Sequence, residues 1–347
     1  MCDMSFSSNA VTAKCRAVFG RSLTAQDYSQ LCDKKNVAEA AAYLKNTPRF
    51  SAALSGIDPQ TIHRGQLETR LAESVFDIFD SFRRFDFTES QWFFREIVTR
   101  LEIEQILIAL QGVANGSTDS YITALPPFLI QRSHIDLLAL GRARSFEDIG
   151  SQLAGTEYGR ILQPLISTPP DGGRLNIREC ERRLFTKYYL SCMKNVEKSC
   201  RGSKRTELKR AFLKSIDMKN VVTCCRMRAF GFDAGAAQQQ LIPFRSRLSR
   251  EVTEQLMQQS DISRIEARLA EIGYRTNGEA QFSTIEQLTE RISLDYLRRT
   301  MRISQNAAAV YYCLIECLEI ELRNVKTIIE GIRYGLAGNE IYQMLVI

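Results

Sequence analysis

The sequence predicts an all-α protein built from three similar helical units. Only eight prolines occur in 347 residues, and helix-forming residues dominate many long windows. Apolar residues recur at helical spacing, and short β-branched runs such as Val221–Thr223 lie inside that periodicity. An acid, an amide and a glycine also recur in the same order at three places, which indicates an internal repeat.

The recurring motif lies in residues 101–116, 215–231 and 320–335. Its amides, Gln105, Asn220 and Asn324, stand 115 and 104 residues apart, which is the size of a domain. The acids that precede these amides are Glu102 and Glu104, then Asp217, then Glu321. We expect the glycine that follows each helix to cap its C-terminal end, namely Gly112, Gly231, and Gly331 or Gly335.

Two interpretations of the acid–amide pair remain open at this point. In the first, each amide packs at a half-buried position and bonds the end of a neighbouring helix, because a buried unpaired group costs about 1–3 kcal/mol. In the second, the polar groups line a space shared by three related helices around one axis. The candidates for such a lining or for inter-helix contacts are Glu104, Gln105, Asp217, Asn220, Glu321 and Asn324.

The segments after the first two motifs, residues 125–158 and 241–274, are also alike. Each reads as a proline-marked turn, a helix, a break that begins with a serine (Ser145, Ser260), and a second helix. In both segments a leucine of the second helix stands five residues before a final tyrosine. The third motif lies near the C-terminal end, and its downstream counterpart occurs at residues 20–50, with Thr24 as the expected N-cap. We therefore expect one unit to be split between the two ends of the chain.

A long amphipathic segment precedes each motif, at residues 66–85, 179–196 and 285–303. Each is followed by a polar break that contains a serine (Ser90, Ser203, Ser304). The predicted units are residues 1–75 with 296–347, residues 76–185, and residues 186–295, each of four or five helices. Three such units joined by short links suggest a pseudo-threefold arrangement.

Composition restricts the compartment and the kind of partner. No signal peptide precedes the ten cysteines, so we expect free thiols in a reducing cytoplasm. No stretch approaches the roughly 20 apolar residues that span a bilayer, so any membrane association is expected to depend on partners. The net charge of +6 is modest. Residues 194–210 contain seven basic residues but no aromatic residue, which favours a solvated loop over a nucleic-acid site.

The residues expected of common catalytic and metal sites are missing. Only His63 and His134 occur, no CxxC pair is present, and there is no phosphate-binding loop, nucleophile elbow or HExxH motif. Cys313 and Cys317 share a helix face and are expected to pack as small core residues. We therefore expect no catalytic residue, no cofactor and no metal site, and the sequence argues against an enzyme.

Three stretches resemble the family of C subunits of bacterial and archaeal vacuolar-type (A/V-type) ATP synthases, which are equivalent to the d subunit of the eukaryotic vacuolar ATPase. They are residues 13–50, residues 212–231 with the following LIPF at 241–244, and residues 319–341. The resemblance covers nearly the whole chain. The sequence departs from the pattern at Gln105, where the other copies carry asparagine, and at the PPF of residues 126–128.

The resemblance implies a funnel of three helical domains and a non-catalytic coupling role in a rotary ATPase. Such a protein is a socket that joins the central stalk, made of D- and F-type subunits, to the membrane proteolipid ring. It lies on the cytoplasmic face and transmits torque for proton or sodium transport. The alternatives are a helical-repeat scaffold that binds another protein or nucleic acid, and an all-α enzyme with an unrecognised site.

Overall fold

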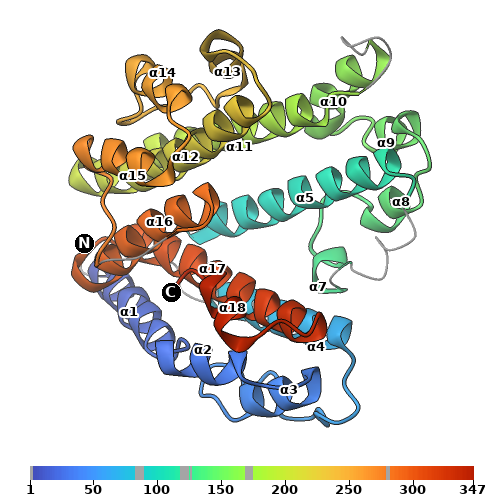
Figure 1. Ribbon diagram of the computed structural model, residues 1–347, viewed down its shortest axis with the longest axis vertical. Coiled ribbons are helices and arrows are strands. Elements are labelled where there is room, and N and C mark those ends of the chain that lie inside the picture. The colour runs from blue at the N-terminus through green and yellow to red at the C-terminus, as the bar shows by residue number, and fades with distance from the viewer. Residues whose placement is uncertain (1–2, 83–89, 118–124, 126, 169–174, 279–281) are drawn as a thin grey trace. The chain divides into compact units, whose positions relative to one another are not determined.

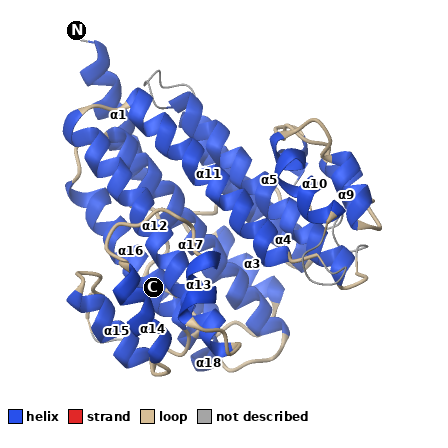
Figure 2. Ribbon diagram, turned by 90° about the horizontal axis from the view of Figure 1, so that it is seen from above, coloured by secondary structure: helices blue, strands red, loops and turns tan. Residues whose placement is uncertain are grey.

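The computed structural model describes residues 3–82, 90–117, 125, 127–168, 175–278 and 282–347. Within these ranges the regular elements are helices, and no strand occurs (Figures 1 and 2). The all-α prediction is therefore confirmed. By contacts the chain forms two compact units, Met1–Thr88 with Cys200–Ile347, and Glu89–Ser199. The division into three units arranged as a funnel stays a prediction.

The first unit brings together helices from both ends of the chain. From the N-terminal end come α1 (Asp3–Phe19), α2 (Ala25–Cys32), α3 (Val37–Lys45) and α4 (Arg64–Ser81). They pack with α17 (Ala307–Arg333) and α18 (Gly338–Gln343), as Figure 1 shows. One apolar core joins both sets, with Leu31, Leu44 and Phe50 packed with Val325 and Ile328. Burying these side chains stabilises the close association of segments almost 300 residues apart.

The remainder of the first unit is built around two long helices. Its elements are α12 (Gly202–Ala229), α13 (Ala234–Gln240), α14 (Arg250–Gln258), α15 (Ile262–Glu271) and α16 (Ile285–Ile303). A second core lies between α12, α14, α15 and α16, and includes Val221, Leu256, Leu269 and Ile292. Short helices α14 and α15 thus cover the apolar side of the long ones.

The second unit contains α5 (Ser90–Ala114), α7 (Pro127–Ile130), α8 (Leu137–Gly141), α9 (Phe146–Gln152), α10 (Glu157–Ser167) and α11 (Ile177–Ser199). The long helices α5 and α11 pack along each other. Between them the Glu96 carboxylate accepts hydrogen bonds from Ser191 Oγ at 2.9 Å and Asn195 Nδ2 at 2.8 Å. Burial raises the pKa of Glu96 above its ordinary value.

The expected helix starts are largely confirmed. Thr24 and Ser145 cap α2 and α9 with capping boxes, each closed by an aspartate three residues later. The start of α15 differs from the prediction by one residue, because Asp261 rather than Ser260 accepts the capping bond.

The C-terminal ends of α5, α12 and α17 share one geometry, with a glycine in the left-handed region. Gly116, Gly231 and Gly335 have φ values of 64°, 80° and 71°. The residue after each glycine donates to a carbonyl five residues back, at 2.9 Å from Ser117, 3.1 Å from Phe232 and 3.0 Å from Leu336. Gly231 is therefore a cap as expected. Of the two glycines expected at the third copy, Gly335 is the cap, and Gly331 lies inside α17 and supplies the accepting carbonyl. Gly112 was wrong as a cap, because it lies inside α5 and supplies the accepting carbonyl there.

Candidate functional site

Asp217 on α12 holds the loop that leads into α14. Its carboxylate is buried and accepts the backbone N–H groups of Arg247 at 2.8 Å, Ser246 at 3.2 Å and Leu248 at 3.3 Å. The Tyr274 hydroxyl donates to the same carboxylate at 2.5 Å. Burial, and then the Asp217 charge, raise the pKa of Tyr274 far above its ordinary range. Four donors thus compensate for the removal of the carboxylate from water.

Glu321 on α17 is the equivalent acid in the third copy of the motif. One carboxylate oxygen accepts the Leu23 N–H at 2.7 Å, and the other accepts Arg49 Nε at 2.7 Å. Both side chains of the ion pair are buried. Leu23 immediately precedes the N-cap of α2, as Leu248 precedes the N-cap of α14. Arg49 thus donates a side-chain hydrogen bond to Glu321, as Tyr274 does to Asp217.

On α5 the equivalent acid is Glu102. It is fully buried and accepts Ser133 Oγ at 2.9 Å, the His134 backbone N–H, and the Tyr158 hydroxyl at 2.5 Å. The His134 ring Nδ1 lies 3.2 Å from the same carboxylate. Glu104, the other acid in this motif, is exposed.

The spacing along the chain would have distinguished these two acids. Each buried acid stands three residues before its amide and 14 residues before the left-handed glycine: 102 to 116, 217 to 231, and 321 to 335. Gly112, which the sequence suggests as the glycine of the first motif, does not stand 14 residues after either acid. With Gly116 as the reference, Glu102 is the repeat residue.

Two of the three amides clamp a backbone segment that lies 22 residues further on. Asn220 donates from Nδ2 to the Ile242 carbonyl at 3.0 Å and accepts the Ile242 N–H at 2.9 Å. Asn324 makes the same pair of bonds with Val346, at 2.7 and 3.0 Å. All four residues are buried. These bonds favour the packing interpretation for both asparagines.

Gln105 differs for a chemical reason. It is partly buried on α5. In the LPPF of the second unit, the residue equivalent to Ile242 of LIPF is Pro126, which has no N–H to donate. Pro126 itself lies outside the described residues. A proline in this part of the motif cannot donate the N–H that completes the asparagine pair, which distinguishes the first copy from the other two.

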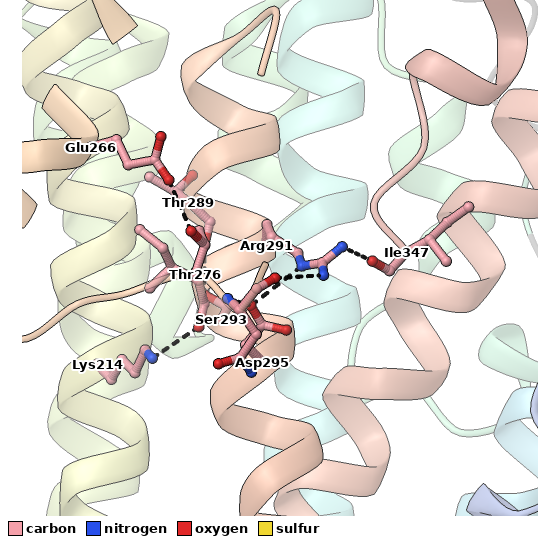
Figure 3. Close-up of polar contacts among 10 residues, drawn as sticks. Lys214, Glu266, Thr276, Thr289, Arg291, Ser293, Asp295 and Ile347 are labelled. Atoms are coloured by element: carbon pink, nitrogen blue, oxygen red, sulfur yellow. Dashed lines mark hydrogen bonds and ion pairs between the residues drawn. The ribbon is translucent and has the colours of Figure 1, made fainter. Parts of the chain in front are cut away.

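A polar junction on α16 was not predicted from the sequence. Arg291 donates from Nη2 to the Asn277 carbonyl at 3.2 Å, lies 3.3 Å from Asp295 through Nε, and donates to the Ile347 carbonyl (Figure 3). Asp295 in turn accepts the Asn277 N–H at 2.7 Å. This one arginine ties α16 to the loop after α15 and to the last residue of the chain.

Lys214 on α12 is a half-buried lysine that links two helices of the first unit. Its ammonium donates to the Ile292 carbonyl of α16 at 2.9 Å, as Figure 3 shows, and lies over the Tyr296 ring at 4.5 Å. Burial lowers the pKa of Lys214 to about 7, against a smaller opposing effect of Asp295. The half-buried lysine thus links α12 to α16.

The described residues contain no cluster of His, Cys, Asp and Glu that could hold a metal ion. The nine described cysteines are buried, and burial raises the pKa of Cys224 and Cys225 to about 12 and about 11. Cys313 and Cys317 pack in the core, as expected. Among the described helices, none is long and apolar enough to cross a membrane.

Comparisons with known proteins agree with the resemblance seen in the sequence. A family profile described as "ATP synthase (C/AC39) subunit" matches residues 11–344. The chain is 23% identical over 329 residues to the C subunit of the A-type ATP synthase of Pyrococcus furiosus, covering 91% of this chain and 84% of that protein. It is 23% identical over 234 residues to the protein of the same name from Thermococcus gammatolerans, covering 67% of this chain and 59% of that protein. The chain belongs to the ATP synthase (C/AC39) subunit family.

Proposed function

We propose that the chain is a non-catalytic coupling component of a rotary A/V-type ATPase or ATP synthase. It acts as a socket on the cytoplasmic face of the membrane, between the central stalk and the proteolipid ring, and transmits torque during proton or sodium transport. The stalk partners are D- and F-type subunits. The family match over residues 11–344 is the observation that carries this proposal.

The internal bonding suits a part that must transmit torque without deforming. In each copy of the motif a buried acid, Glu102, Asp217 or Glu321, fixes the loop or turn ahead of a short helix through bonds of 2.5 to 3.3 Å. A buried carboxylate that accepts bonds from several segments restricts those segments to one defined arrangement. A socket needs such fixed geometry more than it needs a reactive group.

The proposal is tested by assembly and by coupling. The tagged full chain is co-expressed with stalk subunits and with proteolipid-ring subunits, and the purified material is identified by mass spectrometry. We expect both partners to be recovered with the chain, and we expect no ATP hydrolysis by the chain alone. Adding the chain to a complex depleted of it should restore ATP-driven ion pumping. ATP turnover by the isolated chain, or recovery of neither partner at low salt, contradicts the proposal.

A further inference from the structure

The chain contains two Asn–Gly pairs, Asn115–Gly116 and Asn277–Gly278. Asparagine is one of the chemically labile residues of proteins, because the backbone nitrogen of the next residue can attack its side-chain amide carbon. A following glycine favours this attack, since it has no Cβ and lets the backbone approach closely. All four residues are exposed. The surrounding hydrogen bonds therefore decide which pair reacts.

Hydrogen bonds at the C-terminal end of α5 hold back the first pair. The Gly116 N–H, whose nitrogen would attack Asn115, donates to the Val113 carbonyl at 3.2 Å. The Ser117 N–H donates to the Gly112 carbonyl at 2.9 Å. Both bonds break when the Gly116 nitrogen turns towards the Asn115 side chain, because that turn moves the end of the helix. The first pair is therefore protected by the helix cap that it forms.

The second pair lies in the loop between α15 and α16, and its reacting groups are free of such bonds. Neither the Asn277 side chain nor the Gly278 N–H has a hydrogen-bond partner among the described residues. A carbon added at Gly278 would have nothing within 4 Å, so there is room for the attack. Asp295 accepts the Asn277 N–H at 2.7 Å, a bond that the attack leaves intact.

We propose that Asn277 is a site of spontaneous deamidation and that isoaspartate is its main product. The Gly278 nitrogen forms a bond to Cγ of Asn277 and gives up its proton to water. The Cγ–Nδ2 bond breaks, and the nitrogen takes up a proton from water and leaves as ammonia. A second water then opens the cyclic imide, which leaves a carboxylate in place of the amide. Water is the one co-reactant, and nothing is oxidised or reduced.

Arg291 favours one of the two ways in which the imide opens. Its Nη2 donates to the Asn277 carbonyl at 3.2 Å, and Figure 3 shows the arginine beside Asp295. Attack of water on this carbonyl carbon places negative charge on the oxygen that faces the guanidinium, which stabilises that charge. Opening there gives isoaspartate, whose new carboxylate stays opposite Arg291 as an ion pair. Opening at Cγ instead gives aspartate.

The test incubates the full chain for several weeks in mildly alkaline buffer and follows each Asn–Gly pair by peptide mass spectrometry. Asn277 should deamidate at least about tenfold faster than Asn115, because two hydrogen bonds break before Asn115 reacts. Asn115 is thus a control within the same molecule. In urea the two pairs should react at similar rates, since unfolding removes both hydrogen bonds. Asn277→Gln should show no deamidation at this position over the same period, because glutamine would have to close a larger ring.

The role of Arg291 is tested by the ratio of the two products, which does not depend on the overall rate. Fragmentation by electron transfer distinguishes isoaspartate from aspartate. Arg291→Gln should lower the ratio of isoaspartate to aspartate several-fold, and Arg291→Lys, which keeps a cation, should recover part of it. A merely structural role of Arg291 would change the rate and not this ratio. Circular dichroism of both variants should match the parent spectrum.

Two results overturn the site: equal rates at Asn277 and Asn115 in the folded chain, or an unmodified Asn277 in the folded chain after the urea control has reacted. An unchanged product ratio in Arg291→Gln overturns the assignment of Arg291. These measurements involve neither stalk nor ring subunits, so their outcome is independent of the proposed function.

Discussion

Replacing Asn220 by leucine isolates the contribution of the repeated amide clamp. Leucine has a similar volume, so little cavity is left, but the Ile242 N–H and carbonyl lose partners at 2.9 and 3.0 Å. Asn220 is 1% exposed and Ile242 is 7% exposed, so water does not replace those partners. Each backbone group left without a partner costs about 1–3 kcal/mol, so the two together should lower the free energy of unfolding by about 2–6 kcal/mol.

Urea unfolding of the full chain, followed by far-ultraviolet circular dichroism, measures the total loss. Native-state hydrogen exchange then localises it, because the Ile242 amide should exchange far faster in Asn220→Leu while the Val346 amide keeps its protection. Asn324→Leu is the reciprocal variant and should expose Val346 instead. Gln105→Leu is the matched control. It should cost less than about 1 kcal/mol, because no comparable pair of buried bonds is lost.

Equal losses of stability in Asn220→Leu and Gln105→Leu would refute this account of the clamp. Continued protection of the Ile242 amide in Asn220→Leu would refute it equally. Either result would mean that apolar packing, and not the clamp, holds the LIPF segment in place.

Three further changes have defined outcomes. Arg49→Leu leaves Glu321 buried without its cation and should cost about 3–5 kcal/mol in urea unfolding, whereas Arg49→Leu with Glu321→Gln should recover part of the loss. The folded pKa of Lys214, about 7, lies below its ordinary 10.5, so the unfolded chain binds more protons between these values and stability rises with pH there. Between pH 6.5 and 8.5 the parent should therefore gain about 2 kcal/mol relative to Lys214→Met, and parallel stability–pH curves would contradict this. Gly231→Ala forces a side chain to a φ of 80° and should lower stability by about 1–2 kcal/mol in thermal melts, although nothing lies within 4 Å of the added carbon.

The helices and many of their caps could be predicted because their signals are local. Thr24 and Ser145 each stand three residues before an aspartate, and the capping bond depends on nothing beyond that spacing. The glycine caps were harder, because a glycine in the last turns of a helix and one just past it look alike in sequence. Only the backbone distinguishes Gly112, inside α5, from Gly116 at a φ of 64°.

The sequence by itself determined the class of fold and the recurrence of an acid, an amide and a glycine, since helical periodicity and fixed spacing are properties of the chain. Tertiary structure decided what each recurring group bonds. Asp217 receives its hydroxyl donor from Tyr274, 57 residues away, while Glu321 receives its cation from Arg49, 272 residues away. Such partners depend on which helix ends pack together, because a buried carboxylate accepts whichever donor the packed segment brings within reach. The contacts of Arg291 and of the half-buried Lys214 likewise depend on which helices pack together.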